Sequence, residues 1–172
     1  VIDYQKVLEQ HEKSDADITI VYRNQVVTED LADHMTIEVN EDGRVNKATL
    51  RAKVGEEASV AVNVWVINRR LLEGLLVDAA ATGAKSFHRD VLFANVKSLK
   101  IYGYNYEGVY LHMNSMENYY KGNMLLLNDQ IRNELFGNQE KRIYTKVRDS
   151  APTRYGEDAI VQNSFIADGC EI

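Results

Sequence analysis

Histidine and cysteine are the residue types of this chain best suited to proton transfer, nucleophilic attack or metal binding, and they are few. His88 and His112 lie in runs that mix polar and aromatic residues, and Cys170 is the single cysteine. No other His or Cys stands at chelating spacing from His112, and no His neighbours Cys170 in the sequence. A thiol without a neighbouring base has no evident route to the reactive thiolate. We therefore interpret His88 as a structural or exposed residue, Cys170 as a buried packing thiol and His112 as a polar residue at a strand end.

Acidic and aromatic side chains offer two further candidate sites. Glu29, Asp30 and nearby acids weakly resemble a metal site, but they lie in a polar stretch that we predict to be a solvated loop. Tyr102, Tyr104 and Tyr106 recur at every second position and could stack on a sugar. Aromatic side chains on one face of a strand also pack against cross-strand neighbours, and we favour that role here.

The composition excludes some classes of function. Acids outnumber bases by 26 to 20 over 172 residues, giving a formal net charge of −6, so no basic excess exists to bind a nucleic acid backbone. One cysteine excludes an internal disulfide framework and favours a reducing cytoplasm. No apolar run is long enough to span a membrane. The chain opens directly in a helical pattern without an initiator Met, and we interpret it as an excised fragment.

Apolar periodicity predicts alternating helices and strands. Val60, Val62, Val64 and Val66 alternate with mostly apolar residues over 58–67, so both faces of this strand are expected to be buried at the centre of a sheet. The other predicted elements are a helix at 3–13, strands at 18–22 and 35–39, a turn at 40–43 with a return strand from Val45, loops at 23–34 and 51–57, a helix between Asn68 and Gly83, a short helix at 87–93, strands at 99–106 and 109–113, and helical segments from Ser115 to Phe136. The order indicates a mixed α/β domain.

The pattern changes after Gly137. Residues 137–152 read as a linker, and then Ile160, Ile166 and Ile172 recur every six residues. Ser164 and Cys170 each follow an isoleucine by four positions. A six-residue repeat of this kind fits the flat sides of a β-helix, although an ordinary strand-turn-strand explains the pattern as well.

An ordered set of segments resembles a sugar nucleotidyltransferase family, the ADP-glucose pyrophosphorylases, across essentially the whole chain. The segments that carry the resemblance are Ile2–His11, Ala16–Thr19, Ile37–Val45, Val64–Ile67, Phe87–Leu92, Tyr119–Met124, Ile143–Lys146 and Asn163–Cys170. The resemblance implies an α/β fold: residues 1–136 as the C-terminal part of a Rossmann-like nucleotidyltransferase domain, 137–152 as a linker and 153–172 as the first coil of a left-handed hexapeptide-repeat β-helix. It also implies that the family's N-terminal third, with its glycine-rich nucleotide loop, is absent.

The resemblance further implies a site for nucleotidyl transfer, with a divalent metal held by carboxylates. The metal-binding aspartate position holds His112, and the Ser-Met-Gly run that meets the sugar reads Ala61-Val62-Asn63. Where active members of the family have an aromatic residue followed by glycine, this sequence has His34-Met35. Magnesium prefers hard oxygen ligands, so His112 is a poor replacement.

The resemblance also implies a Glu-Lys-Pro triplet whose lysine pairs with the sugar phosphate. This sequence contains no such triplet. Arg51 and Lys53 lie nearest, and we interpret them as solvated loop charges. The sequence therefore predicts no catalytic residue, no metal ligand and a degenerate sugar-phosphate site at His34, Met35, Ala61 and Asn63. Mg²⁺ and ATP are expected only in an active relative.

These departures favour a non-catalytic regulatory subunit of the D type, which joins a catalytic subunit in a hetero-oligomer and modulates it. Self-association of the chain is a further expectation, and neither a nucleic acid nor a membrane partner is expected. A catalytically competent glucose-1-phosphate adenylyltransferase remains the alternative. A hexapeptide-repeat acyltransferase is disfavoured, because residues 153–172 contain no histidine.

Overall fold

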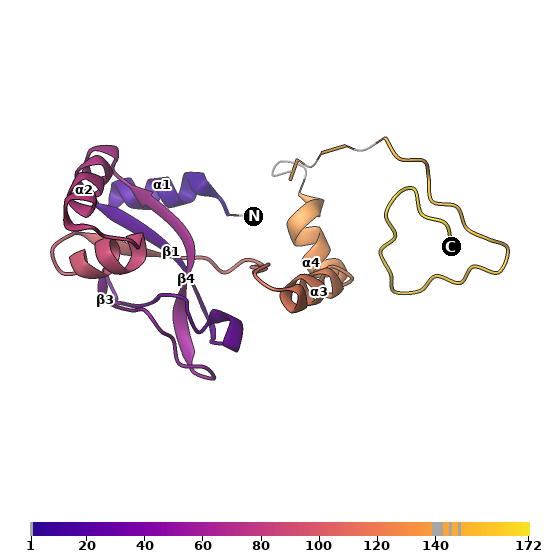
Figure 1. The fold of residues 1–172 in the computed structure, drawn as a ribbon, viewed down its shortest axis with the longest axis horizontal. Coiled ribbons are helices and arrows are strands. Elements are labelled where there is room, and N and C mark those ends of the chain that lie inside the picture. Colours follow the sequence, from indigo (N-terminus) through magenta and orange to yellow (C-terminus); the bar gives the residue numbers. More distant parts are fainter. Residues whose placement is uncertain (1, 139–142, 145, 148) are drawn as a thin grey trace. The chain divides into compact units, whose positions relative to one another are not determined.

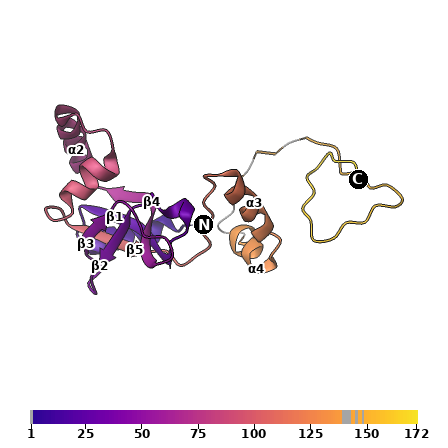
Figure 2. The same cartoon turned by 60° about the horizontal axis from the view of Figure 1, so that its bottom comes forward.

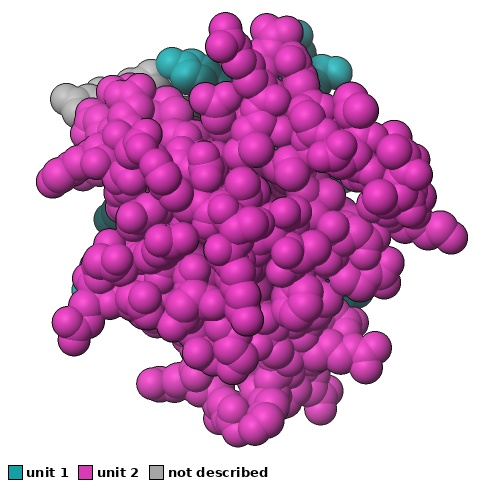
Figure 3. All heavy atoms as spheres, turned by 90° about the vertical axis from the view of Figure 1, so that its left-hand side faces the viewer, with its two compact units in different colours: residues 1, 109–172 teal, residues 2–108 magenta. Residues whose placement is uncertain are grey.

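The structure is a computed structural model that describes residues 2–138, 143–144, 146–147 and 149–172 (Figure 1). Parts of the expected linker and of the 143–146 segment therefore lie outside the described residues. The described chain forms two compact units, residues 2–108 and residues 109–172. The side chains of the first unit fill the surface drawn in magenta in Figure 3. The predicted domain boundaries at 136 and 153 stay predictions.

A five-stranded mixed sheet forms the centre of the first unit. Its strands, in the spatial order β3-β2-β4-β1-β5, are β1 (Ile18–Val26), β2 (Thr36–Val39), β3 (Val45–Thr49), β4 (Glu57–Ile67) and β5 (Ile101–Asn105). β4 pairs antiparallel with β1 and β2, and β5 pairs parallel with β1. The prediction that the 58–67 strand lies at the centre of the sheet is confirmed. β1 is longer than predicted, because it continues past residue 22 alongside β4.

The hairpin of β2 and β3 bends over one face of the sheet until its turn reaches β5. The Gly103 amide donates a hydrogen bond of 2.9 Å to the Gly43 carbonyl, and Arg44 forms a bridge with Tyr102. Gly43 adopts φ 85°, a conformation that glycine tolerates without strain. The turn predicted at residues 40–43 is thus confirmed, and it closes the outer edge of β5.

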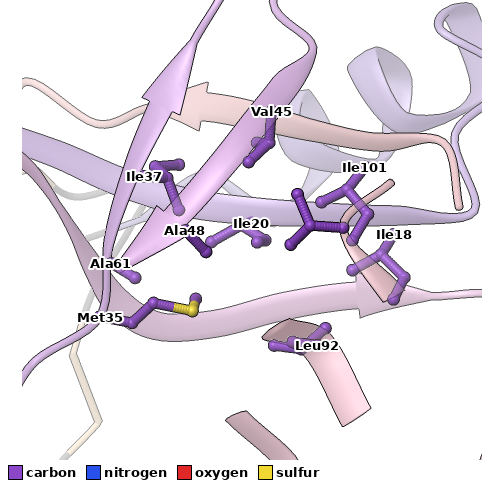
Figure 4. Close-up of a cluster of buried hydrophobic side chains, with 10 residues drawn as sticks. Ile18, Ile20, Met35, Ile37, Val45, Ala48, Ala61, Leu92 and Ile101 are labelled. Carbon is purple, nitrogen blue, oxygen red and sulfur yellow. The ribbon is translucent and has the colours of Figure 1, made fainter. Parts of the chain in front are cut away.

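The main hydrophobic core lies between the bent hairpin and the rest of the sheet (Figure 4). Ile18, Ile20 and Ile101 are almost completely buried in it, and Leu92 covers it from a helical segment. Because all five strands contribute side chains to this one cluster, the packing fixes how the hairpin folds over β1 and β5. The side chains that form the cluster are Ile18, Ile20, Met35, Ile37, Val45, Ala48, Ala61, Leu92, Val96 and Ile101.

Three helices flank this sheet. Helix α1 (Tyr4–Lys13) buries Val7 and is tied to β5 by Gln10, whose side-chain amide donates 2.8 Å to the Gly103 carbonyl. Helix α2 (Arg69–Thr82) starts after Asn68, whose side chain accepts from the Arg70 amide, and ends before Gly83 at φ 71°. Figure 2 shows α2 projecting from the sheet beside the π-helical segment η2 (Phe87–Phe93). Both predicted ends of α2 are confirmed, and each follows from local capping chemistry.

The second unit begins with helices. Its helical segments are α3 (Met116–Leu125), α4 (Asp129–Arg132) and the π-helical η3 (Asn133–Gly137). Ser115 caps α3 as predicted, by accepting from the Asn118 amide. The strand predicted at 109–113 is wrong: these residues have no regular structure. The reason is that a strand needs a neighbouring strand, whereas the Val109 amide donates to the side chain of Glu134 at 2.7 Å.

Residues 149–172 have almost no regular structure and return on themselves (Figure 1). Arg154 forms a parallel bridge with Glu171, and the Gly156 amide donates 2.7 Å to the Ile172 carbonyl. Ile160 is exposed, at 83% of its full surface, and Ile166 is half-buried. A complete β-helix is not formed by these residues. In the described part of the chain, every helix is too short or too polar to cross a bilayer.

Candidate functional site

The β4 strand contains a bulge at the residues that the family resemblance assigned to the sugar. The pairing with β1 jumps from Val21↔Val64 to Tyr22↔Ala61, which leaves Val62 and Asn63 without partners on β1. Asn63 adopts φ 59°, in the left-handed region that favours glycine and that asparagine tolerates better than most residues. The backbone at Asn63 therefore has a conformation suited to glycine, although it carries a side chain.

The Asn63 side chain contacts a histidine from a distant part of the sequence. Asn63 Oδ1 lies 3.1 Å from His88 Nε2, so the imidazole donates this hydrogen bond when Nε2 carries the proton. His88 also packs edge-on against Trp65, with ring centroids 4.5 Å apart, and Trp65 lies 5.5 Å from Phe87. Burial lowers the pKa of His88, which favours the neutral imidazole.

The start of η2, the segment that carries His88, is fixed by Asp90. The Asp90 carboxylate accepts from the backbone amides of Lys85 at 2.8 Å and Ser86 at 2.9 Å, and from Arg89 Nε at 2.7 Å. These hydrogen bonds, of which the one from Arg89 has the largest effect, hold the pKa of Asp90 well below its usual range. Because the Asp90 carboxylate stays charged and accepts all of these hydrogen bonds, it anchors the segment that presents His88 to β4.

Met35 and Ala61 lie together inside the core. The Ala61 amide donates a hydrogen bond of 2.9 Å to the Met35 carbonyl. Ala61 is 0% exposed and Met35 is 4% exposed (Figure 4). His34 is half-buried, and its amide donates to the Leu31 carbonyl at 2.9 Å. Side chains buried to this degree pack against protein atoms. Met35 and Ala61 therefore present no side-chain surface to a ligand in solution.

Arg51 and Lys53 line a groove of about 520 Å³ beside β2, β3 and the start of β4. Lys53 pairs with Glu56 at 3.3 Å, and Lys47 on the same groove pairs with Glu38 at 2.6 Å. All four of these side chains are largely exposed. Acids offset the bases, so the groove carries no concentrated positive charge for a phosphate.

His112 belongs to the second unit. Its ring stacks on Tyr110 with centroids 6.1 Å apart and planes 14° from parallel. Among the described residues, no group of three or more His, Cys, Asp or Glu side chains lies close enough to hold a metal ion. A neutral imidazole supplies one nitrogen and no negative charge, whereas Mg²⁺ binds through carboxylate and phosphate oxygens. The residues present at this position therefore do not fit the magnesium ion that the family chemistry uses.

The sequence names Met35, Ala61 and Asn63 as degenerate site positions, and their role stays a prediction. The sequence pattern does not reveal the partner of Asn63, because its contact with His88 joins residues 25 positions apart. One signal was present: Asn63 is the polar residue within the apolar run of residues 60–67. Asparagine tolerates the left-handed backbone better than most residues, so its presence in such a run is compatible with a bulge.

Comparison with curated proteins identifies relatives of this chain. It is 31% identical over 110 residues to the glycogen biosynthesis protein GlgD of Bacillus subtilis, an alignment that covers 64% of this chain and 32% of that protein. It is 23% identical over 175 aligned positions to the glucose-1-phosphate adenylyltransferase of Clostridium novyi, covering 99% of this chain and 45% of the enzyme. The adenylyltransferase of Mycoplasma mobile is 24% identical, with the same coverage.

The chain is thus similar to proteins of the glucose-1-phosphate adenylyltransferase family, GlgD among them. It spans about a third to a half of the length of these relatives. No protein-family model matches it. These relatives support the predicted family resemblance, and the five-stranded α/β unit is consistent with a nucleotidyltransferase-like domain.

Proposed function

We propose that these residues belong to a non-catalytic regulatory subunit of glucose-1-phosphate adenylyltransferase, which modulates a catalytic partner in glycogen biosynthesis. The observation that carries the proposal is the bulge in β4. Asn63 holds the left-handed conformation at the position that the resemblance assigns to a sugar-contacting glycine, and its side chain is bonded to His88. A glycine leaves the backbone open to close approach, whereas the Asn63 side chain covers it.

The burial of Met35 and Ala61 supports the same proposal. Ala61 replaces a hydroxyl-bearing side chain of active relatives, and its methyl group lies in the core. Positioning of the attacking phosphate depends on such contacts, and misplacement by about 1 Å can cost roughly a hundredfold in rate. Loss of several contacts at one site is therefore expected to leave little turnover.

The metal position supports it further. A divalent metal in an active relative offsets the negative charge that develops on the transferring phosphate, an effect worth several kcal/mol. His112 stands at the position of its carboxylate ligand and lacks that charge. Mg²⁺ and ATP are therefore expected at the site of a catalytic partner, not at His112.

The relatives also favour a regulatory role. The identity to GlgD is 31%, whereas the adenylyltransferases align at 23–25%. The proposed partner is a catalytic subunit of the same family in a hetero-oligomer, and self-association of this chain is the second assembly that we expect.

We extend the proposal to the architecture of the longer protein. Residues 1–136 would form the C-terminal part of a Rossmann-like domain, and residues 153–172 the first coil of a left-handed β-helix. The parallel bridge between Arg154 and Glu171 joins residues 17 positions apart. Three six-residue sides make one coil of similar length, so this pairing supports a coil that begins to stack on itself.

A catalytically competent glucose-1-phosphate adenylyltransferase is the second candidate. The observation that favours it is the extent of the alignments, since proteins of that name match over 98–99% of this chain. The two candidates differ in what the full-length protein does without a partner.

The deciding experiment assays the purified full-length protein for synthesis of ADP-glucose from ATP and glucose 1-phosphate, alone and with a catalytic subunit from the same organism. The proposal expects no turnover alone and a changed kcat or KM in the mixture. Turnover by the protein alone at a rate typical of an enzyme would establish the second candidate. A mixture that behaves as the catalytic subunit alone would reject the regulatory role.

A further inference from the structure

Helix α2 is attached to the first unit by one side only. Leu71 and Leu75, which lie one turn apart, pack against the main core. Every residue of α2 is half-buried or exposed, and the helix projects from the sheet (Figure 2). Because an α-helix has about 3.6 residues per turn, other residues occupy the side opposite to these leucines. The structure therefore leaves a second, outward face on α2.

The outward face of α2 carries an apolar patch. Leu76 is 52% exposed and Val77 is 68% exposed, and the exposed Ala80 follows Leu76 by four positions. Residues three or four apart are neighbours on a helix, so Leu76, Val77 and Ala80 form one surface, which we name the outer patch. Removing apolar surface from water is worth about 25 cal/mol per Å². A partner that covers the outer patch is therefore favoured.

The charged residues of α2 oppose the dipole of the helix itself. Arg69 and Arg70 lie in the first turn, at the positive end of the dipole, whereas cations are favoured at the negative, C-terminal end. Arg69 pairs with Glu73 at 2.8 Å, but Arg70 forms no ion pair with any residue that the structure describes. Arg70 precedes Val77 by seven positions, or about two turns, so both lie on the same side of the helix. The partner of the outer patch should therefore present negative charge to Arg70.

We propose that a second copy of this chain packs on α2, with the two helices antiparallel about a twofold axis near Leu76 and Val77. The outer patches of the two copies then cover each other. The same arrangement places Arg70 of each copy beside the C-terminal end of the other helix, where the carbonyl groups supply negative partial charge. The inference identifies a surface for the self-association expected under the proposed function, and it rests on that proposal for this expectation alone.

Sedimentation velocity of the full-length protein over a range of concentrations tests the proposal. A contact made by one helix face from each copy is a small interface, so the wild type should form a dimer that dissociates on dilution. Leu76→Glu combined with Val77→Glu should raise the dissociation constant by about tenfold or more, because like charges would face each other. Val54→Glu is the matched control, since Val54 is also 52% exposed but lies in the turn before β4. A wild type that stays monomeric, or a dimer unchanged by the double substitution, would overturn the proposal.

Arg70→Glu separates a loss of the interface from a loss of folding. An acidic residue in the first turn suits the dipole of its own helix, so the diluted variant should be at least as stable as the wild type in urea unfolding. In the dimer the same residue would face the negative end of the other helix. The dissociation constant should therefore rise by about threefold to tenfold, since two symmetric contacts are reversed. A variant that dimerises as tightly as the wild type would contradict the antiparallel arrangement.

Disulfide cross-linking tests the orientation of the two helices. In a Cys170→Ser background without other cysteines, Glu73→Cys and Ala80→Cys are prepared separately and then mixed. An antiparallel pair centred near Val77 brings residue 73 of one copy beside residue 80 of the other, so cross-linked dimers should form in the mixture and much less in either variant alone. Efficient cross-linking within each single variant indicates parallel helices and would refute the proposal.

A catalytic subunit of the same family is the other occupant that the experiments distinguish. If the Leu76→Glu and Val77→Glu double variant still self-associates but no longer changes the kinetics of a catalytic subunit, α2 binds that subunit and the proposal is wrong. If the wild type dimerises through α2 and also synthesises ADP-glucose alone, the proposed function fails and this inference stands. A monomeric protein that modulates a catalytic subunit would give the opposite result.

Discussion

Gly103 lies so close to Tyr22 that a Cβ atom on residue 103 would stand 2.7 Å from Tyr22 Cε1. The two residues belong to the neighbouring strands β5 and β1. The same glycine donates its amide to Gly43 and accepts from the Gln10 side chain, so it joins the hairpin, α1 and the sheet. The close approach of the Tyr22 ring and this three-way junction both depend on the absence of a side chain.

Gly103→Ala is therefore expected to destabilise the unit of residues 2–108. The added methyl group must displace the Tyr22 ring or separate β5 from the hairpin, and overpacking of this kind costs about 1–3 kcal/mol. Urea unfolding monitored by circular dichroism measures the effect. Gly74→Ala on α2 is the matched control, because nothing lies within 4 Å of its Cβ position. A Gly103→Ala variant as stable as the wild type would contradict the packing at Tyr22.

Asn63 provides a test of the bulge conformation. Asn63→Val should destabilise the fold by about 1–2 kcal/mol through backbone strain, because a β-branched residue is disfavoured at φ 59°. Asn63→Gly keeps the backbone relaxed and loses only the hydrogen bond to His88. The free energy of unfolding is thus expected to be highest for the wild type, lower for Asn63→Gly and lowest for Asn63→Val. A valine variant more stable than the glycine variant would show that residue 63 does not adopt the left-handed conformation.

Asp90 should make the stability depend on pH in the acid range. Its pKa in the folded protein is lower than the value of 3.8 for a free side chain, so folding favours the charged form. The stabilisation is fully present above the unfolded-state pKa and is lost as the pH falls through the folded-state value. Asp90→Asn should therefore be less stable than the wild type at pH 7, and the difference should shrink at lower pH.

Thermal unfolding midpoints of both proteins between pH 7 and pH 2 measure this dependence. Arg89→Gln is a useful comparison, since it removes the guanidinium that donates two hydrogen bonds to Asp90 but leaves the two backbone amides in place. It should give a smaller loss than Asp90→Asn. A constant difference between Asp90→Asn and the wild type over the whole range would contradict the assigned role of the carboxylate.

His112→Asp should not by itself create an adenylyltransferase. The substitution restores one carboxylate, but Ala61 and Met35 remain in the core and Asn63 remains bonded to His88. Synthesis of ADP-glucose by the full-length variant, measured without a catalytic partner, is expected to stay at background. Turnover restored by this single change would show that the sugar site is intact and that the metal ligand alone was missing.

Features that depend on local chemistry, or on a long run of one pattern, could be predicted from the sequence. Asn68 and Ser115 cap helices because their side chains accept from backbone amides two or three residues away. The central place of β4 follows from apolar residues on both of its faces, which only a strand covered on both sides can bury. The resemblance to this family also follows from the order of short segments, and the relatives support it.

Features that join residues far apart in the sequence could not be predicted, because they depend on how the elements pack. Residues 109–113 have the composition of a strand but no strand beside them, and a ladder cannot form alone. The bulge at Asn63 exists only because β1 and β4 pair with a register shift, and its partner His88 arrives from another element. Sequence patterns report which face of an element is apolar. They do not report which distant side chain reaches a given atom, because that depends on how the elements pack.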